Sequence, residues 1–440
     1  MAVRRANVKT IESMSETDKQ VLHAIYTHRC LTGDLLYRFF YKSMNISRDF
    51  TAKRVRWMIQ HNLIEPIEYG ADLPALFLTT QGIETYRYIE DIPVEVLDPE
   101  TGTLQRALKT AADLKMKPNN IRHQIALSSF HLMFDARSNH EFFYSYVDEK
   151  FIRVSAAIRP DGLIQMNNAD LFLEMDMGTE RRDVLLSKWN HYREFLKSKN
   201  YRYKEKKTIM LFIVNNVKLV EQRRAVILST LQVGLLDALD SMFEIYVDTP
   251  ENLLDIVFRK FTPNSLQYIE DFRSFSNTVL SLHQFVFSAS SFMTKVAPYS
   301  SYMAYIRKLD NNRHILVQDG RPQEFLFDSY LDRPLTVLHQ ITAHRKICAE
   351  MIRTIGRKIP YLVLVSDEKS FYQDLTLAQC LDLSDVYFTT RDRLASTSFP
   401  EALFQYDGNG NLFHFRDFGM QERVFERTVK TTAVTRAGIH

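Results

Sequence analysis

The chain contains the sequence Arg159-Pro160-Asp161-Gly162 and, shortly after it, Asp170-Leu171-Phe172-Leu173-Glu174-Met175-Asp176. Alternate residues of a β-strand share a face, so Glu174 and Asp176 are expected to point the same way at the end of an apolar strand. Neighbouring carboxylates repel each other unless a proton or a cation neutralises them, and Mg²⁺ prefers oxygen ligands. We therefore expect Asp161, Glu174 and Asp176 to form a weak Mg²⁺ or Mn²⁺ site.

A second explanation of the same residues needs no metal. Asp176 starts a turn that ends at Gly178, and Glu174 pairs with an arginine such as Arg182. Short motifs often match by chance, so both explanations stay open. His123 and His131 lie eight residues apart, on nearly the same side of a helix, and His339 with His344 lacks metal-ligand spacing. All four are expected to be ordinary surface or core histidines.

The bulk composition favours a globular protein of two or three domains. The 440 residues are 45% hydrophobic and 25% charged, with a formal net charge of +3. No apolar run approaches the roughly 20 residues of a membrane-spanning helix, and the N-terminus lacks the apolar core of a signal peptide. Cys30, Cys348 and Cys380 are too few and too far apart for a disulfide framework or a zinc site. We expect a cytoplasmic protein with no membrane segment.

The head of the chain, residues 16–92, has the apolar spacing of three helices followed by a β-hairpin and a last helix. Helices are expected at 16–29, at 31–40 and from the N-cap Ser47 to about His61, and the last at 83–89. Strands are expected at 64–69 and 75–79. In the third helix the residues expected to face inward are Phe50, Val55, Met58 and Ile59.

This order resembles the winged helix-turn-helix of bacterial DNA-binding proteins, as do the turn Asn62-Leu63-Ile64 and the sequence Leu78-Thr79-Thr80-Gln81-Gly82. The resemblance implies that the third helix enters the major groove of double-stranded DNA. Arginine reads guanine edges, whereas lysine and threonine hold phosphates. The residues expected to contact DNA are Arg48, Thr51, Lys53, Arg54 and Arg56. A head used only for protein contacts is the alternative.

Beyond the head, residues 93–118 have the composition of a linker, and α/β segments follow it. Helices are expected at 121–134 and 182–197, and strands at 142–146, 153–158, 170–176, 209–214 and 243–247. The last third repeats this order, with strands at 325–328, 361–365 and 385–390 and a helix at 335–355. The repeat predicts a duplicated lobe that has lost the acid triplet, because Tyr330 follows Asp328 at the matching spacing.

The chain also resembles the replication-relaxation family of plasmids and mobile elements in Gram-positive bacteria. The matching parts are the head, the Pro160-Asp161 segment, the run from Leu171 to Glu180, and Lys188 with Tyr192. The resemblance covers about residues 15–260 and implies a middle domain similar to the PD-(D/E)xK nuclease fold. Asp176 stands where an active nuclease of that fold has lysine, so Lys188 would have to replace the missing cation.

These expectations describe an α/β protein with a head at 16–92, a linker at 93–118, a nuclease-like domain at 119–290, a degenerate nuclease-like domain at 291–424 and a tail at 425–440. The expected function is DNA binding in plasmid or mobile-element replication, relaxation or mobilisation. If the protein cleaves DNA, the expected catalytic residues are Asp161, Glu174, Asp176 and Lys188. The alternatives are a transcription regulator whose inert lobes form a homodimer and a metal-dependent endonuclease.

Overall fold

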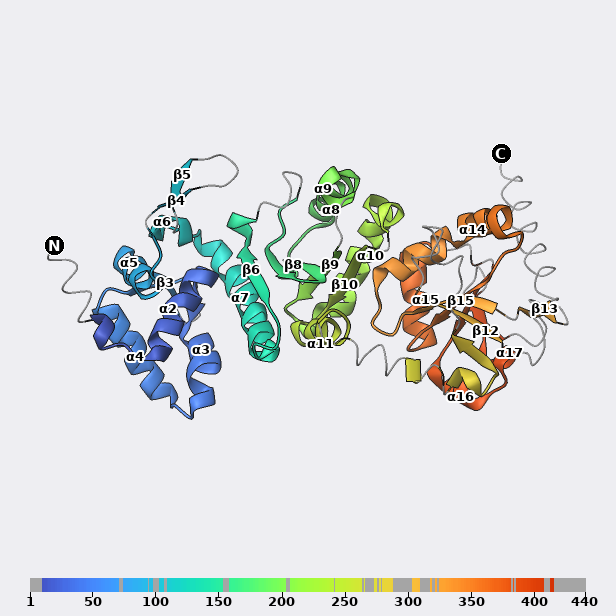
Figure 1. The fold of residues 1–440 in the computed structure, drawn as a ribbon, viewed down its shortest axis with the longest axis horizontal. Helices are drawn as coiled ribbons and strands as arrows, with labels where there is room; N and C mark the ends of the chain where they lie inside the picture. Colours follow the sequence, from blue (N-terminus) through green and yellow to red (C-terminus); the bar gives the residue numbers. More distant parts are fainter. Residues whose placement is uncertain are drawn as a thin grey trace. The chain divides into compact units, whose positions relative to one another are not determined.

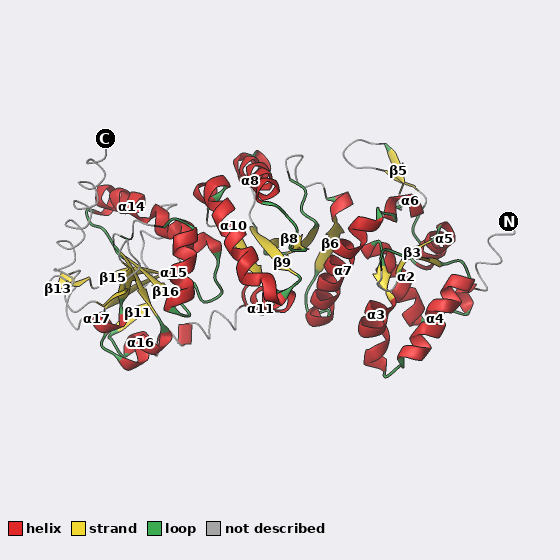
Figure 2. Cartoon of the chain, turned by 180° about the vertical axis from the view of Figure 1, so that it is seen from behind, coloured by secondary structure: helices red, strands yellow, loops and turns green. Residues whose placement is uncertain are grey.

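In the computed structural model, the described residues are 10–70, 74–93, 95–97, 103–106, 109–152, 158–202, 206–240, 242–262, 265, 273–274, 277, 279–287, 303–308, 317–318, 321–322, 324–380, 383, 385–406 and 412–414. Helices and strands are mixed along the chain, which confirms the predicted α/β class (Figure 2). The chain divides into two compact units, residues 1–153 with 159–167 and 171–177, and residues 178–440 with 154–158 and 168–170. None of the described helices combines the length and apolar composition needed to cross a bilayer.

The head is a group of helices around a small antiparallel sheet of order β1-β3-β2 (Figure 1). Its elements are α2 (Glu16–His28), β1 (Leu31–Thr32), α3 (Gly33–Leu36), α4 (Arg48–Gln60), β2 (Ile64–Ile67), β3 (Ala75–Leu78) and α5 (Thr80–Ile89). Ser15 and Ser47 cap α2 and α4 by accepting backbone N–H groups, as serine at an N-cap should. Asn62 has a φ of 55°, the left-handed value expected after the end of α4.

The helix expected at 31–40 was wrong in its first part. Leu31 and Thr32 form a strand that pairs with Leu76 and Ala75 of β3. Because of this long-range pairing the helix begins only at Gly33, and a π-helical turn follows over Tyr37–Tyr41. Tertiary contacts have therefore overridden the helical periodicity of this segment.

The inward face of α4 differs from the prediction at Phe50. Met58 is fully buried, and Val55 and Ile59 are half-buried against the core of the head, which includes Val21, Leu22, Ile25, Leu36 and Ile83. Phe50 remains 47% exposed. The buried stripe of α4 runs through Thr51, Val55 and Met58 instead, at the i, i+4, i+7 spacing of one helix face, and this rotation turns Phe50 outward.

Gly82 marks the closest approach in the head. A Cβ built at Gly82 would lie 1.9 Å from the carbonyl oxygen of Leu63, so only glycine lets α5 start against the chain that leads into β2. Thr79 caps α5 and also donates its hydroxyl to the backbone carbonyls of Asn62 and Leu63. Gln81 donates to the carbonyl of His61. These contacts tie the end of α4 to the start of α5.

The segment after the head contains more structure than a linker. The antiparallel pair β4 (Glu95–Leu97) and β5 (Leu104–Arg106) lies there, followed by α6 (Ala111–Leu114). Next come α7 (Pro118–Ser138), β6 (Tyr144–Asp148), β7 (Gly162–Met166) and β8 (Ala169–Asp176). Of the strand expected at 153–158, all but Ile158 lies outside the described residues.

Buried polar contacts join the head to α7 and β6. Arg29 donates to the carboxylate of Asp148, whose side chain is fully buried, and to the carbonyls of Leu114 and Lys115. One step earlier on α2, His28 Nε2 lies 3.2 Å from His131 Nδ1 of α7, and both rings are buried. Buried polar groups with partners fix geometry, so the head and this layer form one compact body.

The second unit begins with an α/β segment. It contains α8 (Arg182–Lys197), β9 (Lys207–Val214), α10 (Val220–Gly234), β10 (Phe243–Asp248) and α11 (Pro250–Lys260). Strands β9 and β10 are parallel neighbours, as the continuous apolar run in β9 predicted.

The last third contains a seven-stranded sheet of order β11-β12-β15-β16-β17-β18-β19. Its strands are β11 (Phe285–Phe287), β12 (Ala304–Lys308), β15 (Glu324–Ser329), β16 (Tyr361–Leu364), β17 (Val386–Thr389), β18 (Phe404–Tyr406) and β19 (Leu412–His414), with α14 (Leu335–Ile355) and α15 (Glu368–Leu377) between strands. Strands β11 and β12 are antiparallel neighbours, as β6 and β7 are in the first unit. Strands β16 and β17, joined by α15, are parallel, as are β9 and β10, joined by α10. The duplication itself stays a prediction.

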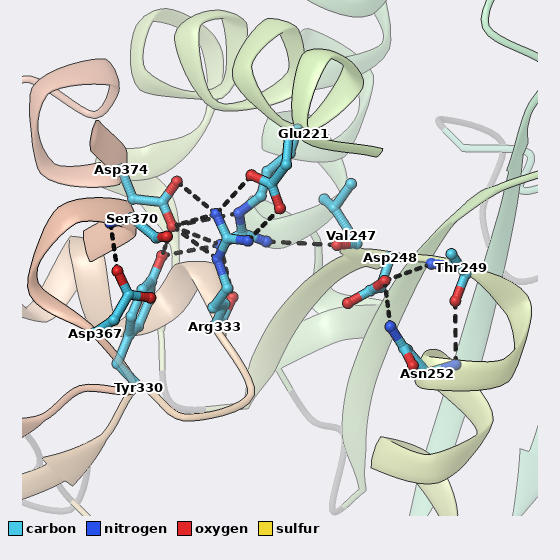
Figure 3. Close-up of polar contacts among 11 residues, drawn as sticks. Glu221, Val247, Asp248, Thr249, Asn252, Tyr330, Arg333, Asp367, Ser370 and Asp374 are labelled. Carbon is cyan, nitrogen blue, oxygen red and sulfur yellow. Dashed lines mark hydrogen bonds and ion pairs between the residues drawn. The ribbon is translucent and has the colours of Figure 1, made fainter. Parts of the chain in front are cut away.

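A buried ion network lies within the second unit. Arg224 of α10 is 2% exposed and donates to the carboxylate of Asp374 on α15, to the Tyr330 hydroxyl and to the carbonyl of Arg333. Arg333 pairs with Asp374 and Glu221, as Figure 3 shows. Two guanidinium groups therefore neutralise one buried carboxylate, which lets α10 and α15 pack against each other.

Candidate nucleic-acid interface

A buried ion pair sets the orientation of α4. Arg54 donates from Nε to Oδ1 of Asp18 at 3.2 Å, and its Nη2 contacts Oδ2. Asp18 lies on α2, and its side chain is fully buried, whereas 21% of the Arg54 side chain is exposed. The guanidinium also lies 4.4 Å from the ring centre of Trp57. Arg54 thus holds α4 against α2.

The same carboxylate has three more donors. The Ser15 backbone N–H donates to Oδ2 at 2.8 Å, the Ser15 hydroxyl to Oδ2 at 2.7 Å and the Tyr41 hydroxyl to Oδ1 at 3.2 Å. Burial alone would raise the pKa of Asp18, but the hydrogen bonds from Arg54 and Ser15 outweigh burial and hold that pKa below its ordinary value. Asp18 is therefore an ionised anchor under α4.

The face of α4 opposite this anchor is open to solvent. Its exposed residues, at helical spacing, are Asp49, Ala52, Lys53, Arg56 and Gln60. Within the described residues, Lys53 and Arg56 form no ion pair with the protein. Two cations and a carboxamide on one exposed face are suited to phosphates and base edges.

Two of the five residues expected to contact DNA make contacts inside the protein. Thr51 is 3% exposed and donates its hydroxyl to the carbonyl of Ser47. Arg54 is held by Asp18, as described above. Both follow from the rotation of α4 that also exposes Phe50. Arg48 is exposed, but it pairs with Asp34 at 2.9 Å and lies over the Tyr37 ring.

The acidic residues expected to form a metal site lie around β8. Oδ2 of Asp161 accepts the backbone N–H of Met175 at 2.7 Å and lies 3.1 Å from Nε2 of His123. Glu174 and Asp176 are 2% and 1% exposed on the strand. Among the described residues there is no group of three acidic, histidine or cysteine side chains arranged to hold a metal ion. The predicted triplet is therefore not assembled around a common point.

Lys188, the expected substitute for the missing nuclease lysine, has a different partner. Its Nζ lies 3.0 Å from Oε1 of Glu180, and the ammonium lies 5.4 Å from the Phe212 ring centre. Arg223 donates to the carbonyl of the same glutamate at 3.1 Å. This pairing gives Lys188 a structural role in the second unit.

His123 is the residue whose place the sequence did not predict. It extends from α7 to Asp161, and 32% of its side chain is exposed. Glu149 lies close by, since its backbone N–H donates to the Asp161 carbonyl and its carboxylate pairs with Arg159. Burial and the charge of Asp161 raise the pKa of Glu149, and Arg159 opposes the shift. His123 and Asp161 are 38 positions apart, so no local sequence pattern predicts this contact.

A comparison with family models bears on the whole of this region. The model of replication-relaxation proteins matches residues 22–211. Residues 22–211, less than half of the 440 residues, are therefore similar to replication-relaxation proteins. The matched span contains α4, the segment around Asp161 and strand β8, and it supports the resemblance drawn from the sequence. No curated protein and no solved structure matches the chain.

Proposed function

We propose that the protein binds double-stranded DNA through the exposed face of α4 and acts in the replication or relaxation of a plasmid or mobile element. In this proposal the head is a winged helix-turn-helix, α4 is its recognition helix and the β2–β3 hairpin is its wing. The observation that carries the proposal is that Lys53 and Arg56 both lie on an exposed face of α4. The ion pair of Arg54 with Asp18 fixes the orientation of that face. The match of residues 22–211 to the replication-relaxation family supports the process.

The chemistry of the face supports sequence-selective contacts. Arginine and lysine reach the O6 and N7 atoms of guanine, glutamine pairs with adenine, and aspartate accepts from the amino group of cytosine. Asp49, Arg56 and Gln60 supply three of these groups from one side of α4. Asp49 also lies in the first turn of α4, where a carboxylate interacts favourably with the helix dipole.

We propose binding, and not cleavage, as the activity. Lys188 pairs with Glu180, and Asp161 accepts from Met175 and contacts His123. No observation among the described residues favours a cleavage step over a scaffolding role for the segment around β8. We propose that this segment supports the head and transmits DNA binding to a partner. One such partner would be a second copy of the chain.

The test compares single alanine variants of the full chain on a DNA duplex that the chain selects from a randomised library. Lys53→Ala and Arg56→Ala should each weaken binding by about 1–3 kcal/mol where the residue reads a base, or should lower the salt slope by about 1 where it holds a phosphate. Arg353→Ala is the matched control, because it removes the same charge from a 72% exposed arginine of α14. Equal affinities for all three variants would contradict the recognition-helix proposal.

A further inference from the structure

The exposed aromatic ring on α4 needs an explanation of its own. Phe50 lies in the first turn of the helix, 47% exposed, and takes no part in the core of the head. Single exposed apolar residues are common and need no explanation by themselves. Phe50 differs because it stands beside the face that the proposed function places in the DNA groove.

The surroundings of Phe50 indicate which kind of partner contacts its ring. Its neighbour three residues on, on the adjoining part of the helix surface, is the exposed Lys53. A protein partner would require a continuous apolar patch, whereas among the residues of α4 only Phe50 is an exposed large apolar side chain. A DNA major groove fits both features, because phosphates line its edges and the thymine methyl group is the apolar feature of its floor.

We propose that Phe50 contacts the 5-methyl group of a thymine and makes the bound DNA sequence depend on that base. The inference rests on the proposed function and adds the specificity that the charged residues do not supply. The thymine is expected close to the site of Lys53, because residues three apart on a helix are neighbours on its surface.

The experiment replaces each thymine of the selected duplex, one at a time, by deoxyuridine, which lacks only the methyl group. Binding is measured by fluorescence anisotropy at one salt concentration. One replacement should weaken binding roughly fourfold, since burying one methyl group contributes about 0.8 kcal/mol. The Phe50→Ala variant should bind the thymine duplex and the deoxyuridine duplex with equal affinity, because it lacks the ring that contacts the methyl group.

Phe143→Ala is the matched control, since it truncates a phenylalanine that is 91% exposed and lies away from α4 in sequence. This variant should keep the fourfold difference. The inference is overturned if no thymine position responds to the loss of its methyl group, or if the response persists in Phe50→Ala. A change in sedimenting mass caused by Phe50→Ala, with no thymine effect, would overturn it in favour of a protein partner. Failure of the proposed function is a distinct result, in which the wild-type chain binds neither the thymine duplex nor the deoxyuridine duplex more tightly than unrelated DNA.

Discussion

Replacing Arg54 by alanine separates a structural arginine from one that reads DNA. Removing one partner of a buried ion pair costs about 3–5 kcal/mol, because the other charge stays buried. Arg54 is 21% exposed, and Asp18 keeps its hydrogen bonds from Ser15 and Tyr41. We therefore expect Arg54→Ala to lower the free energy of unfolding of the head by about 2–4 kcal/mol.

The assay uses the two tryptophans of the chain. Trp57 lies under the Arg54 guanidinium, whereas Trp189 is buried in the second unit. In a Trp189→Phe background, urea unfolding followed by fluorescence reports the head alone. Arg48→Ala is the control, because the exposed pair of Arg48 with Asp34 contributes about 1 kcal/mol or less.

The pH dependence supplies a second readout. Because the folded pKa of Asp18 is lowered, its stabilisation is fully present above the unfolded pKa and is lost as the pH falls through the folded pKa. The difference between the wild-type chain and Arg54→Ala should shrink over that acid range. An Arg54→Ala variant that unfolds at the wild-type urea concentration but loses DNA affinity would refute the structural role and restore Arg54 as a DNA contact.

Two further predictions concern buried groups. Burial lowers the pKa of His28 to about 3 and that of His131 well below its ordinary value, so both histidines take up protons on unfolding below about pH 6.5. The head should lose up to about 1.4 kcal/mol of stability per pH unit for each of them as the pH falls from 6.5, and His131→Leu should reduce that slope in urea titrations at pH 7 and 5. Arg224→Met should lower the stability of the second unit by about 2–4 kcal/mol in unfolding followed through Trp189, because Arg333 still neutralises Asp374. An unchanged midpoint would show that the pair of Arg224 with Asp374 contributes nothing.

The local structure of the head was largely predictable from sequence. Ser47 and Asn62 bracket α4 because a capping serine and a left-handed asparagine act over a few residues. The helix predicted at 182–197 appears as α8, Arg182–Lys197, and the strand expected at 170–176 appears as β8, Ala169–Asp176. Caps and apolar periodicity are local properties, so they survive in the folded chain.

The orientation of side chains was not predictable in the same way. Arg54 and Asp18 are 36 positions apart, and no sequence pattern in either segment predicts that the two side chains pair. The residues Lys53 and Arg54 look equivalent in sequence, yet a helical rotation of about 100° sends one to solvent and the other inward. The contacts of Asp161 were unpredictable for a related reason, since they come from His123 and Met175, which are 38 and 14 positions away in the sequence.

The close approach at Gly82 has a consequence for how this protein can diverge. With 1.9 Å between a hypothetical Cβ and the Leu63 carbonyl oxygen, even alanine would force α5 away from the end of α4. Exposed positions such as Gln60 tolerate other side chains, whereas position 82 accepts only glycine. A saturation library at codon 82 should therefore return glycine alone among folded clones.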